Sequence, residues 1–254
     1  RGPGSLLYGS NAMGGVVNII TRQHKQQGRR TQARVMFGSY NTQKYMVNNG
    51  YNIGNFSSFI SLNHDRSDGH RPDSKFNITN GFANLGYRIN NQYKVTGNLS
   101  LAKYNTEDPG TITSPLLDHD MHILRGTTSF ALENHHEKTS GALRVFYNWG
   151  HHKINDGHAV NADPREFLFY SDDHNTGVQL YQSFRLVEGN TFTAGVDYKN
   201  WGGHAWNDSI NGPIGEIVKK SVNEVAGYAI MQQDLFDILS LNAGVRYEHS
   251  SVYG

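Results

Sequence analysis

Apolar and polar residues alternate with a period of two through most of the chain after residue 30. In the segment 92–101, one face carries Tyr93, Val95, Gly97, Leu99 and Leu101, and the intervening residues on the other face are all polar. Segments 141–149, 191–199 and 239–248 show a related alternation. A period of two is typical of β-strands whose two faces meet different surroundings. The pattern therefore predicts an all-β protein.

We predict eleven strands, and many of them are long. A strand of a soluble protein averages about 5–6 residues, whereas a tilted strand that crosses a membrane needs about 9–11. The predicted lengths therefore favour strands that span a bilayer. The predicted spans are 31–38, 42–51, 55–65, 77–89, 91–105, 121–134, 139–151, 171–187, 190–201, 221–236 and 239–250.

The predicted connections alternate in length. Short turns near 52–55, 90–91, 134–138, 188–189 and 237–238 alternate with longer polar segments near 66–76, 106–120, 152–170 and 202–220. Short turns at one end and long loops at the other are typical of a transmembrane antiparallel β-barrel. Bacterial single-chain barrels have even strand numbers. An odd count therefore leads us to expect that the chain is a piece of a longer protein.

Composition excludes several functional classes. The 254 residues include no cysteine, so disulfide frameworks and cysteine zinc sites are excluded. The net charge is +1 and the basic residues are scattered, which argues against a nucleic-acid partner. The apolar runs are too short for a membrane helix. Neither an HExxH nor a GxSxG motif is present, and we expect no enzyme activity.

The first 22 residues differ from the rest of the chain. They read RGPGSLLYGSNAMGGVVNIITR, with glycines that bracket two short apolar pieces. Glycine pairs permit a tight bend and a close approach of the backbone to a neighbour. The segment lacks the Gly-Lys-Ser/Thr ending of a phosphate-binding loop.

This opening segment resembles the end of the plug domain of TonB-dependent outer-membrane receptors. The signature residues are Arg1, Gly2, Pro3, Tyr8, Gly9, Gly14, Gly15 and Asn18, with Leu7, Ser10, Ala12, Val16, Val17, Ile19, Ile20 and Thr21 in agreement. Segments 228–235 and 241–247 resemble a mid-barrel strand pair of the same family. The resemblance thus extends over nearly the whole chain.

The resemblance implies a 22-stranded barrel occluded by an N-terminal plug, in the bacterial outer membrane. Residues 1–24 would then be the end of the plug and residues 25–254 the first half of the barrel. The family imports scarce nutrients with force supplied by TonB. We expect a ferric siderophore or haem as the transported ligand, with cobalamin as an alternative. The partners implied are TonB, outer-membrane lipid including lipopolysaccharide, and the metal chelate itself, with no cofactor of the receptor's own.

Two other functional classes stay open at this point. A passive porin would also be a barrel, but porins have no plug, so residues 1–22 argue against it. A soluble all-β binding module is disfavoured by the strand lengths.

Alternation and resemblance together assign several charged and aromatic side chains. We expect five charged residues to face the lumen and to hold plug to barrel wall, with Arg1 as a plug partner, because a charge that faces lipid costs about 2–4 kcal/mol at the bilayer midplane. Aromatic residues near strand ends suit interfacial girdles, with ordinary packing as the alternative. The charged residues are Arg144, Arg185, Arg246, Asp197 and Glu248, and the aromatic ones are Tyr40, Tyr87, Tyr104, Trp149, Tyr170, Tyr198 and Trp201.

Histidines are the candidate ligand-binding residues. Ten of the 13 lie in or beside predicted extracellular loops, and histidine is a common ligand of metals and haem iron. The candidates are His119 and His122, which bracket Met121, and His151, His152 and His158. The alternative is that they are ordinary polar loop residues. Asp156, Asp163, Asp172 and Asp173 are weaker candidates for Ca²⁺ ligands.

Overall fold

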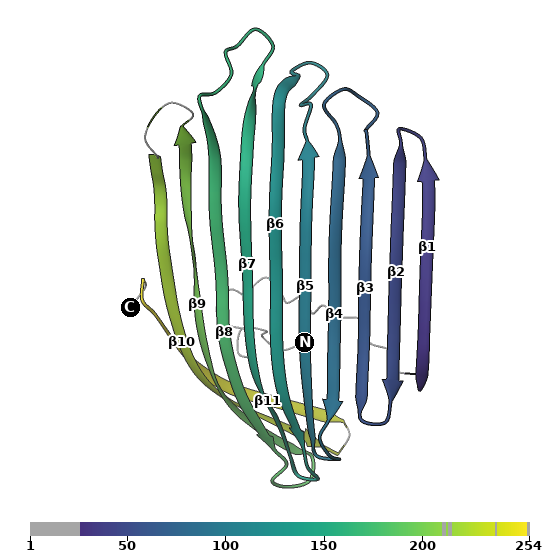
Figure 1. The fold of residues 1–254 in the computed structure, drawn as a ribbon. Coiled ribbons are helices and arrows are strands. Elements are labelled where there is room, and N and C mark those ends of the chain that lie inside the picture. Colours follow the sequence, from purple (N-terminus) through teal and green to yellow (C-terminus); the bar gives the residue numbers. More distant parts are fainter. Residues whose placement is uncertain (1–25, 210–211, 213–214, 237, 253–254) are drawn as a thin grey trace.

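The computed structural model describes residues 26–209, 212, 215–236 and 238–252, which form one antiparallel sheet (Figure 1). Each strand pairs with its neighbours in the sequence, from β1 to β11. The predicted all-β class and the strand count are confirmed. The strands are β1 (Gly28–Gly38), β2 (Thr42–Ile53), β3 (Phe56–Ser67), β4 (Phe76–Arg88), β5 (Tyr93–Glu107), β6 (Leu116–His135), β7 (Thr139–Ala159), β8 (Phe167–Phe184), β9 (Asn190–Ser209), β10 (Gly215–Leu235) and β11 (Leu239–Ser250).

Helices contribute nothing to a membrane crossing in this part of the chain. Among the described residues, none forms a helix with the length and apolar character that such a crossing requires.

The predicted plug segment 1–24 lies outside the described residues. The first strand, β1, begins at Gly28. The boundary between plug and barrel at residues 24 and 25 therefore stays a prediction. The signature residues Arg1, Gly2, Pro3, Tyr8, Gly9, Gly14, Gly15 and Asn18 likewise lie outside the described residues.

Strands β6 to β10 extend further toward the long-loop end of the sheet than the sequence pattern predicts. β6 to β10 contain 18 to 21 residues each, and Figure 1 shows them side by side in the sheet. The predicted loops 106–120, 152–170 and 202–220 are therefore too long, because strand residues occupy both ends of each. Backbone pairing continues where alternation has faded, since both faces of a strand are polar once it leaves the hydrocarbon.

The sheet has one apolar face, which we call the outward face. Its large hydrophobic side chains are exposed, although exposed apolar surface of this extent is uncommon on a protein surrounded by water. The band of these side chains is therefore the surface that meets lipid. It includes Val35, Val47, Ile60, Leu62, Leu85, Leu99, Phe130, Val145, Leu180, Val196 and Val245.

The opposite, inward face is built from polar side chains that bond to one another across strands. Asn84 of β4 donates to Asn98 of β5, and Asn98 donates to Ser129 of β6. Asn84 is only 4% exposed. Buried amides need such partners because an unpaired buried polar group is costly. The inward face is therefore ordered by hydrogen bonds, whereas the outward face is defined by its apolar band.

Aromatic residues divide between the two faces. Trp149 lies on the outward face against Gly126 of β6, where an added Cβ would come within 2.3 Å of the indole ring. The strand register places Tyr104 and Trp201 on the inward face instead. Their assignment to a lipid-facing girdle was wrong, because each is an odd number of residues away from the outward-facing side chains of its strand.

A buried ion pair ties β9 to β11 on the inward face. Arg246 Nη1 lies 2.8 Å from Asp197 Oδ2, and Arg246 Nε donates to Glu248 Oε2 at 3.0 Å. The side chains of Arg246 and Asp197 are 8% and 5% exposed. The ring of Tyr228 on β10 lies under the guanidinium, 5.6 Å from its carbon. Gly195 leaves the space that this ring occupies.

The charged residues expected to face the lumen largely do so. Arg144 lies on the same face as Asp197 and stacks over Tyr181, with its guanidinium carbon 5.6 Å from the ring centroid. Arg185 is the exception, because β8 ends at Phe184 and Arg185 lies in the following turn.

We predict that a charge introduced into the apolar band destabilises the barrel. Val196→Lys places an ammonium among exposed apolar side chains and should lower the free energy of unfolding by about 2–4 kcal/mol. Asn175→Lys, on the inward face of the adjacent strand, should change it by less than about 1 kcal/mol. Urea titration of the full-length receptor in phospholipid vesicles measures both. Equal losses would contradict the assignment of faces.

We further predict that removing the cation of the buried pair is costly. Arg246→Leu leaves Asp197 buried without its partner and should lower the free energy of unfolding by about 3–5 kcal/mol. The double variant with Asp197→Leu should regain part of that loss. Arg66→Gln breaks an exposed pair with Asp68 and should cost at most about 1 kcal/mol. A cost for Arg246→Leu as small as that control would show that the buried pair does not stabilise the sheet.

Candidate functional site

The five candidate histidines all lie in strands rather than in loops. His119 and His122 belong to β6, and His151, His152 and His158 belong to β7. Their predicted placement in extracellular loops is corrected accordingly, because the hairpin of these two strands extends past them. They nevertheless lie toward the loop end of the sheet, as expected.

Strand alternation separates the histidines that the sequence places together. His151 and His152 are consecutive, so their side chains leave opposite faces of β7. His119 and His122 are three residues apart and also point to opposite faces of β6. Neither pair can hold one ion between its two imidazoles. Among the described residues, no group of three or more histidine, aspartate or glutamate side chains is arranged to hold a metal.

His152 belongs to a polar cluster on the inward face. Arg125 of β6 bonds to His152 Nε2 at 3.0 Å and to Asp173 Oδ2 of β8 at 2.8 Å. Because a guanidinium only donates hydrogen bonds, Nε2 of His152 is the acceptor and Nδ1 carries the proton. Nδ1 lies 3.0 Å from Ser171 Oγ and donates to it. Both ring nitrogens are thus engaged.

A glycine makes this cluster possible. Gly150 of β7 lies between Arg125 and Asp173 in the strand register. A Cβ at Gly150 would come within 2.5 Å of Asp173 Oδ1 and 3.1 Å of the guanidinium. Glycine therefore allows the ion pair to cross over β7, and it leaves Arg125 and Asp173 partly exposed to the barrel interior.

A hollow of about 490 Å³ adjoins the cluster. We call it the inward hollow. Its lining includes the indole of Trp201 and the small residues Gly203 and Ala205. Trp201 is held in place because its Nε1 donates to Glu224 at 3.1 Å. The lining also includes Ser171, Asp173, Val222 and Lys220. The site therefore offers an aromatic wall and a lysine, and Arg125 lies next to it through its ion pair with Asp173.

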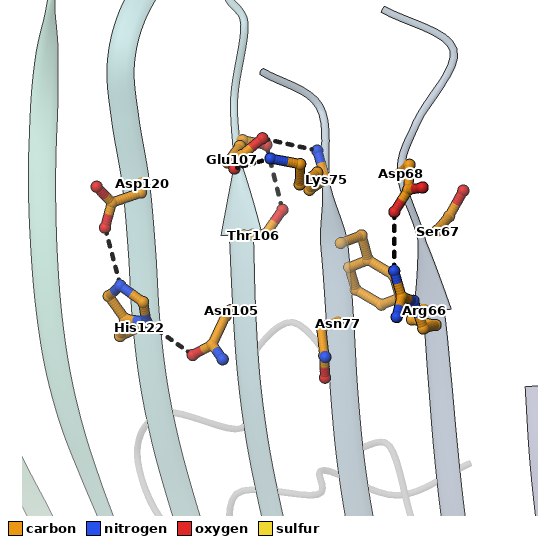
Figure 2. Close-up of a pocket in the computed structure, with 11 residues that line it drawn as sticks. Arg66, Ser67, Asp68, Lys75, Asn77, Asn105, Thr106, Glu107, Asp120 and His122 are labelled. Atoms are coloured by element: carbon orange, nitrogen blue, oxygen red, sulfur yellow. Dashed lines mark hydrogen bonds and ion pairs between the residues drawn. The ribbon is translucent and has the colours of Figure 1, made fainter. Parts of the chain in front are cut away.

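His122 lies on the outward face, in a second hollow of about 420 Å³ at the loop ends of β3 to β6 (Figure 2). It bonds to Asn105 at 2.8 Å and lies 3.0 Å from Asp120. The other cations of this outward hollow are also paired: Arg66 with Asp68 and Lys75 with Glu107. The hydrogen bond from Asn41, and then that from Arg66, lower the pKa of Asp68. These mutually neutralised charges connect the strand ends.

The remaining candidates interact with carboxylates. His151 Nδ1 lies 2.6 Å from Asp172 on the outward face. His158 Nε2 lies 3.4 Å from Asp118, and His119 Nδ1 lies 3.7 Å from Asp108. Asp118 and Gly157 both have positive φ, at 56° and 63°. This backbone irregularity lies between His119 and His158.

Sequence reasoning did not select Arg125, Ser171 or Lys220, and it assigned Trp201 to the wrong face. A signal was present, because the alternation of β9 already placed Trp201 in phase with Asp197. The convergence of Arg125, His152 and Asp173 needed the register of three strands, which the sequence pattern does not supply.

Solved structures that match this fold include transporters and receptors. The ferric yersiniabactin uptake receptor FyuA from Yersinia pestis matches with a TM-score of 0.73 and 15% identity over 98% of this chain and 43% of that one. The ferric citrate transporter FecA in its unliganded form matches with 0.72 and 18% over 98% and 42%. The copper transporter OprC matches with 0.70 and 14% over 91% and 38%. The chain thus spans less than half the length of these three proteins.

A family model gives the assignment directly. The model described as the β-barrel of TonB dependent receptor-like proteins matches residues 30–254, which is most of the chain. The sheet order, the lipid-facing band and the strand lengths agree with such a barrel. The chain belongs to the TonB-dependent receptor family of the bacterial outer membrane, and its described strands form part of the receptor β-barrel.

Proposed function

We propose that the receptor imports an iron complex with energy from TonB, and that a ferric siderophore is its ligand. The observation that carries this proposal is the inward hollow beside the Arg125 cluster. Trp201 offers a flat apolar surface and Lys220 offers positive charge, while the adjacent Arg125 is paired with Asp173. This combination suits a compact anionic chelate with planar groups.

The names of structural neighbours support the substrate class without fixing it. Ferric yersiniabactin and ferric citrate receptors have this fold, as do a copper transporter and the RagAB peptide transporter. The fold alone is therefore compatible with several cargoes. The preference for an iron chelate depends on the chemistry of the inward hollow.

Haem is the second candidate, and among the candidate histidines His152 lies on the inward face beside the inward hollow. Nε2 of His152 accepts a hydrogen bond from Arg125, so axial ligation of haem iron would require this bond to break.

Cobalamin is kept as a third candidate, because its planar ring also suits the aromatic wall of the inward hollow. We also propose that the receptor has no catalytic step, in keeping with a family of transport receptors.

We predict that the inward hollow determines affinity for the iron chelate. Ferric enterobactin, ferric citrate, hemin and cyanocobalamin are titrated separately into the full-length receptor in detergent, and tryptophan fluorescence reports binding. For the chelate that binds, Lys220→Gln should weaken affinity at least about tenfold, because a charge-assisted contact contributes about 1.5–3 kcal/mol. Lys219→Gln, the adjacent residue on the outward face, is the matched control. Equal effects at Lys219 and Lys220 would reject the site.

We predict a distinct spectroscopic result for haem. If hemin is the ligand, the Soret shift should disappear in His152→Gln and persist in His158→Gln, because His152 faces the interior beside the hollow. A shift that survives His152→Gln would exclude axial ligation by this residue.

Iron uptake by cells that express the receptor should stop when TonB is deleted, whichever chelate binds. Uptake that persists without TonB would instead favour a passive pore.

A further inference from the structure

Two arginine–aspartate pairs on the inward face have the same length but opposite exposure. In each, a guanidinium nitrogen lies 2.8 Å from a carboxylate oxygen. The side chains of Arg246 and Asp197 are buried, whereas those of Arg125 and Asp173 are 47% and 40% exposed. A buried pair is costly to break, but water can solvate the separated charges of an exposed one. The pair of Arg125 and Asp173 can therefore exchange its partners.

The two members of the exposed pair lie differently with respect to the inward hollow. Asp173 of β8 lines the hollow. Arg125 lies two strands away on β6, on the far side of Gly150. An anion that enters the hollow therefore meets the carboxylate of Asp173 before it reaches the guanidinium. Asp173 repels such a ligand and also occupies the hydrogen-bond donor that the ligand would use.

A second contact holds Arg125 in place without Asp173. Arg125 Nη1 bonds to His152 Nε2 at 3.0 Å, whereas Arg125 Nη2 bonds to Asp173 Oδ2 at 2.8 Å. Loss of the carboxylate would leave the bond to His152 intact. The guanidinium would then keep its position and could donate through Nη2 to another anionic oxygen. Such charge-assisted hydrogen bonds are among the stronger polar contacts in proteins.

The strand register places the charges of this region in one row across the sheet. The row runs from Arg125 through Gly150, Asp173 and Gly203 to Lys220. The two glycines carry no side chain, so they leave the carboxylate between them room to rotate. Lys220 lines the hollow and has no ion pair within the part of the chain that the structure describes. When the carboxylate turns aside, two cations face a ligand in the hollow.

We propose that Asp173 is a displaceable counter-ion that makes the inward hollow selective for ligands of net negative charge. An oxygen of an anionic ligand replaces Asp173 as the acceptor of the hydrogen bond from Arg125 Nη2, and Lys220 contacts the ligand from the other end of the row. A neutral ligand gains too little from the guanidinium to displace the carboxylate. This inference rests on the proposed function, because it takes the inward hollow as the ligand site. It narrows the ligand to anionic chelates such as ferric catecholates and ferric citrate.

Two chelates of different charge test the selectivity in the full-length receptor in detergent, with tryptophan fluorescence as the readout. Ferric enterobactin is anionic, and in a ferric trihydroxamate the charges of the hydroxamates and Fe³⁺ cancel. Asp173→Asn should bind ferric enterobactin at least about tenfold more tightly than the unchanged receptor and the trihydroxamate with unchanged affinity. Asp172→Asn removes the adjacent carboxylate, which lies on the outward face, and should change neither affinity. An equal gain for both chelates, or equal effects of the two variants, would overturn the proposal.

A double variant distinguishes release of Arg125 from simple repulsion by Asp173. If Asp173 acts by occupying Arg125, the gain in Asp173→Asn should largely disappear in Arg125→Gln/Asp173→Asn, measured against Arg125→Gln alone. A gain of the same size in both backgrounds would show that the carboxylate acts only at a distance, which would overturn the exchange. Urea titration of each variant confirms that the barrel is folded.

Failure of this inference and failure of the proposed function are separate outcomes. If neither the unchanged receptor nor Asp173→Asn binds any of the chelates, the inward hollow is not a chelate site and both are rejected. If the unchanged receptor binds ferric enterobactin and Asp173→Asn binds it no more tightly, the inference alone is rejected. The inference alone also fails if both receptors prefer the trihydroxamate by the same factor.

Discussion

Backbone hydrogen bonding inside a hydrocarbon layer is the constraint on which this structure depends. Lipid offers no partner for an exposed N–H or C=O group, so every strand must be paired on both sides. The order β1 to β11 meets this requirement with tight connections between neighbours in sequence. β1 and β11 are the edges of the described sheet, and the closed barrel of the family is the arrangement that pairs such edges. The same constraint explains why the long strands stay hydrogen-bonded beyond the membrane.

The two faces of the sheet meet different surroundings and carry different kinds of side chain. The outward face needs only apolar side chains within the bilayer, and it becomes polar toward the loop end of the sheet, where His151 and Lys153 follow Trp149 on β7. The inward face can use charge and amide groups freely, since it meets the barrel interior. Arg246 with Asp197 stabilises the wall there, and Arg125 with Asp173 lies beside the inward hollow. Alternation along a single strand therefore separates side chains that meet lipid from side chains that face the barrel interior.

Alternation within the bilayer made the fold predictable, and its loss outside the bilayer set the limit of prediction. The segments 92–101 and 239–248 indicated strands because lipid and interior impose opposite demands on their faces. Beyond Trp149 both faces are polar, so the continuation of β7 to Ala159 left no periodic signal. The predicted alternation already implied that the side chains of His151 and His152 lie on opposite faces of the sheet. They were nevertheless grouped as candidates for one ligand site, because they are consecutive in the sequence. The Arg125 cluster needed three registers, and the plug signature at Arg1 to Thr21 identified a family rather than a geometry.

The unequal length of the strands gives the described part of the barrel wall an uneven rim. β1 to β5 contain 11 to 15 residues each, whereas β6 to β10 contain 18 to 21. A large particle that approaches from outside, such as an antibody or a phage tail fibre, meets the hydrogen-bonded ends of the long strands β6 to β10 before it reaches the shorter strands β1 to β5. Recognition of these long strand ends would depend on their folded shape, because residues far apart in the sequence lie side by side there.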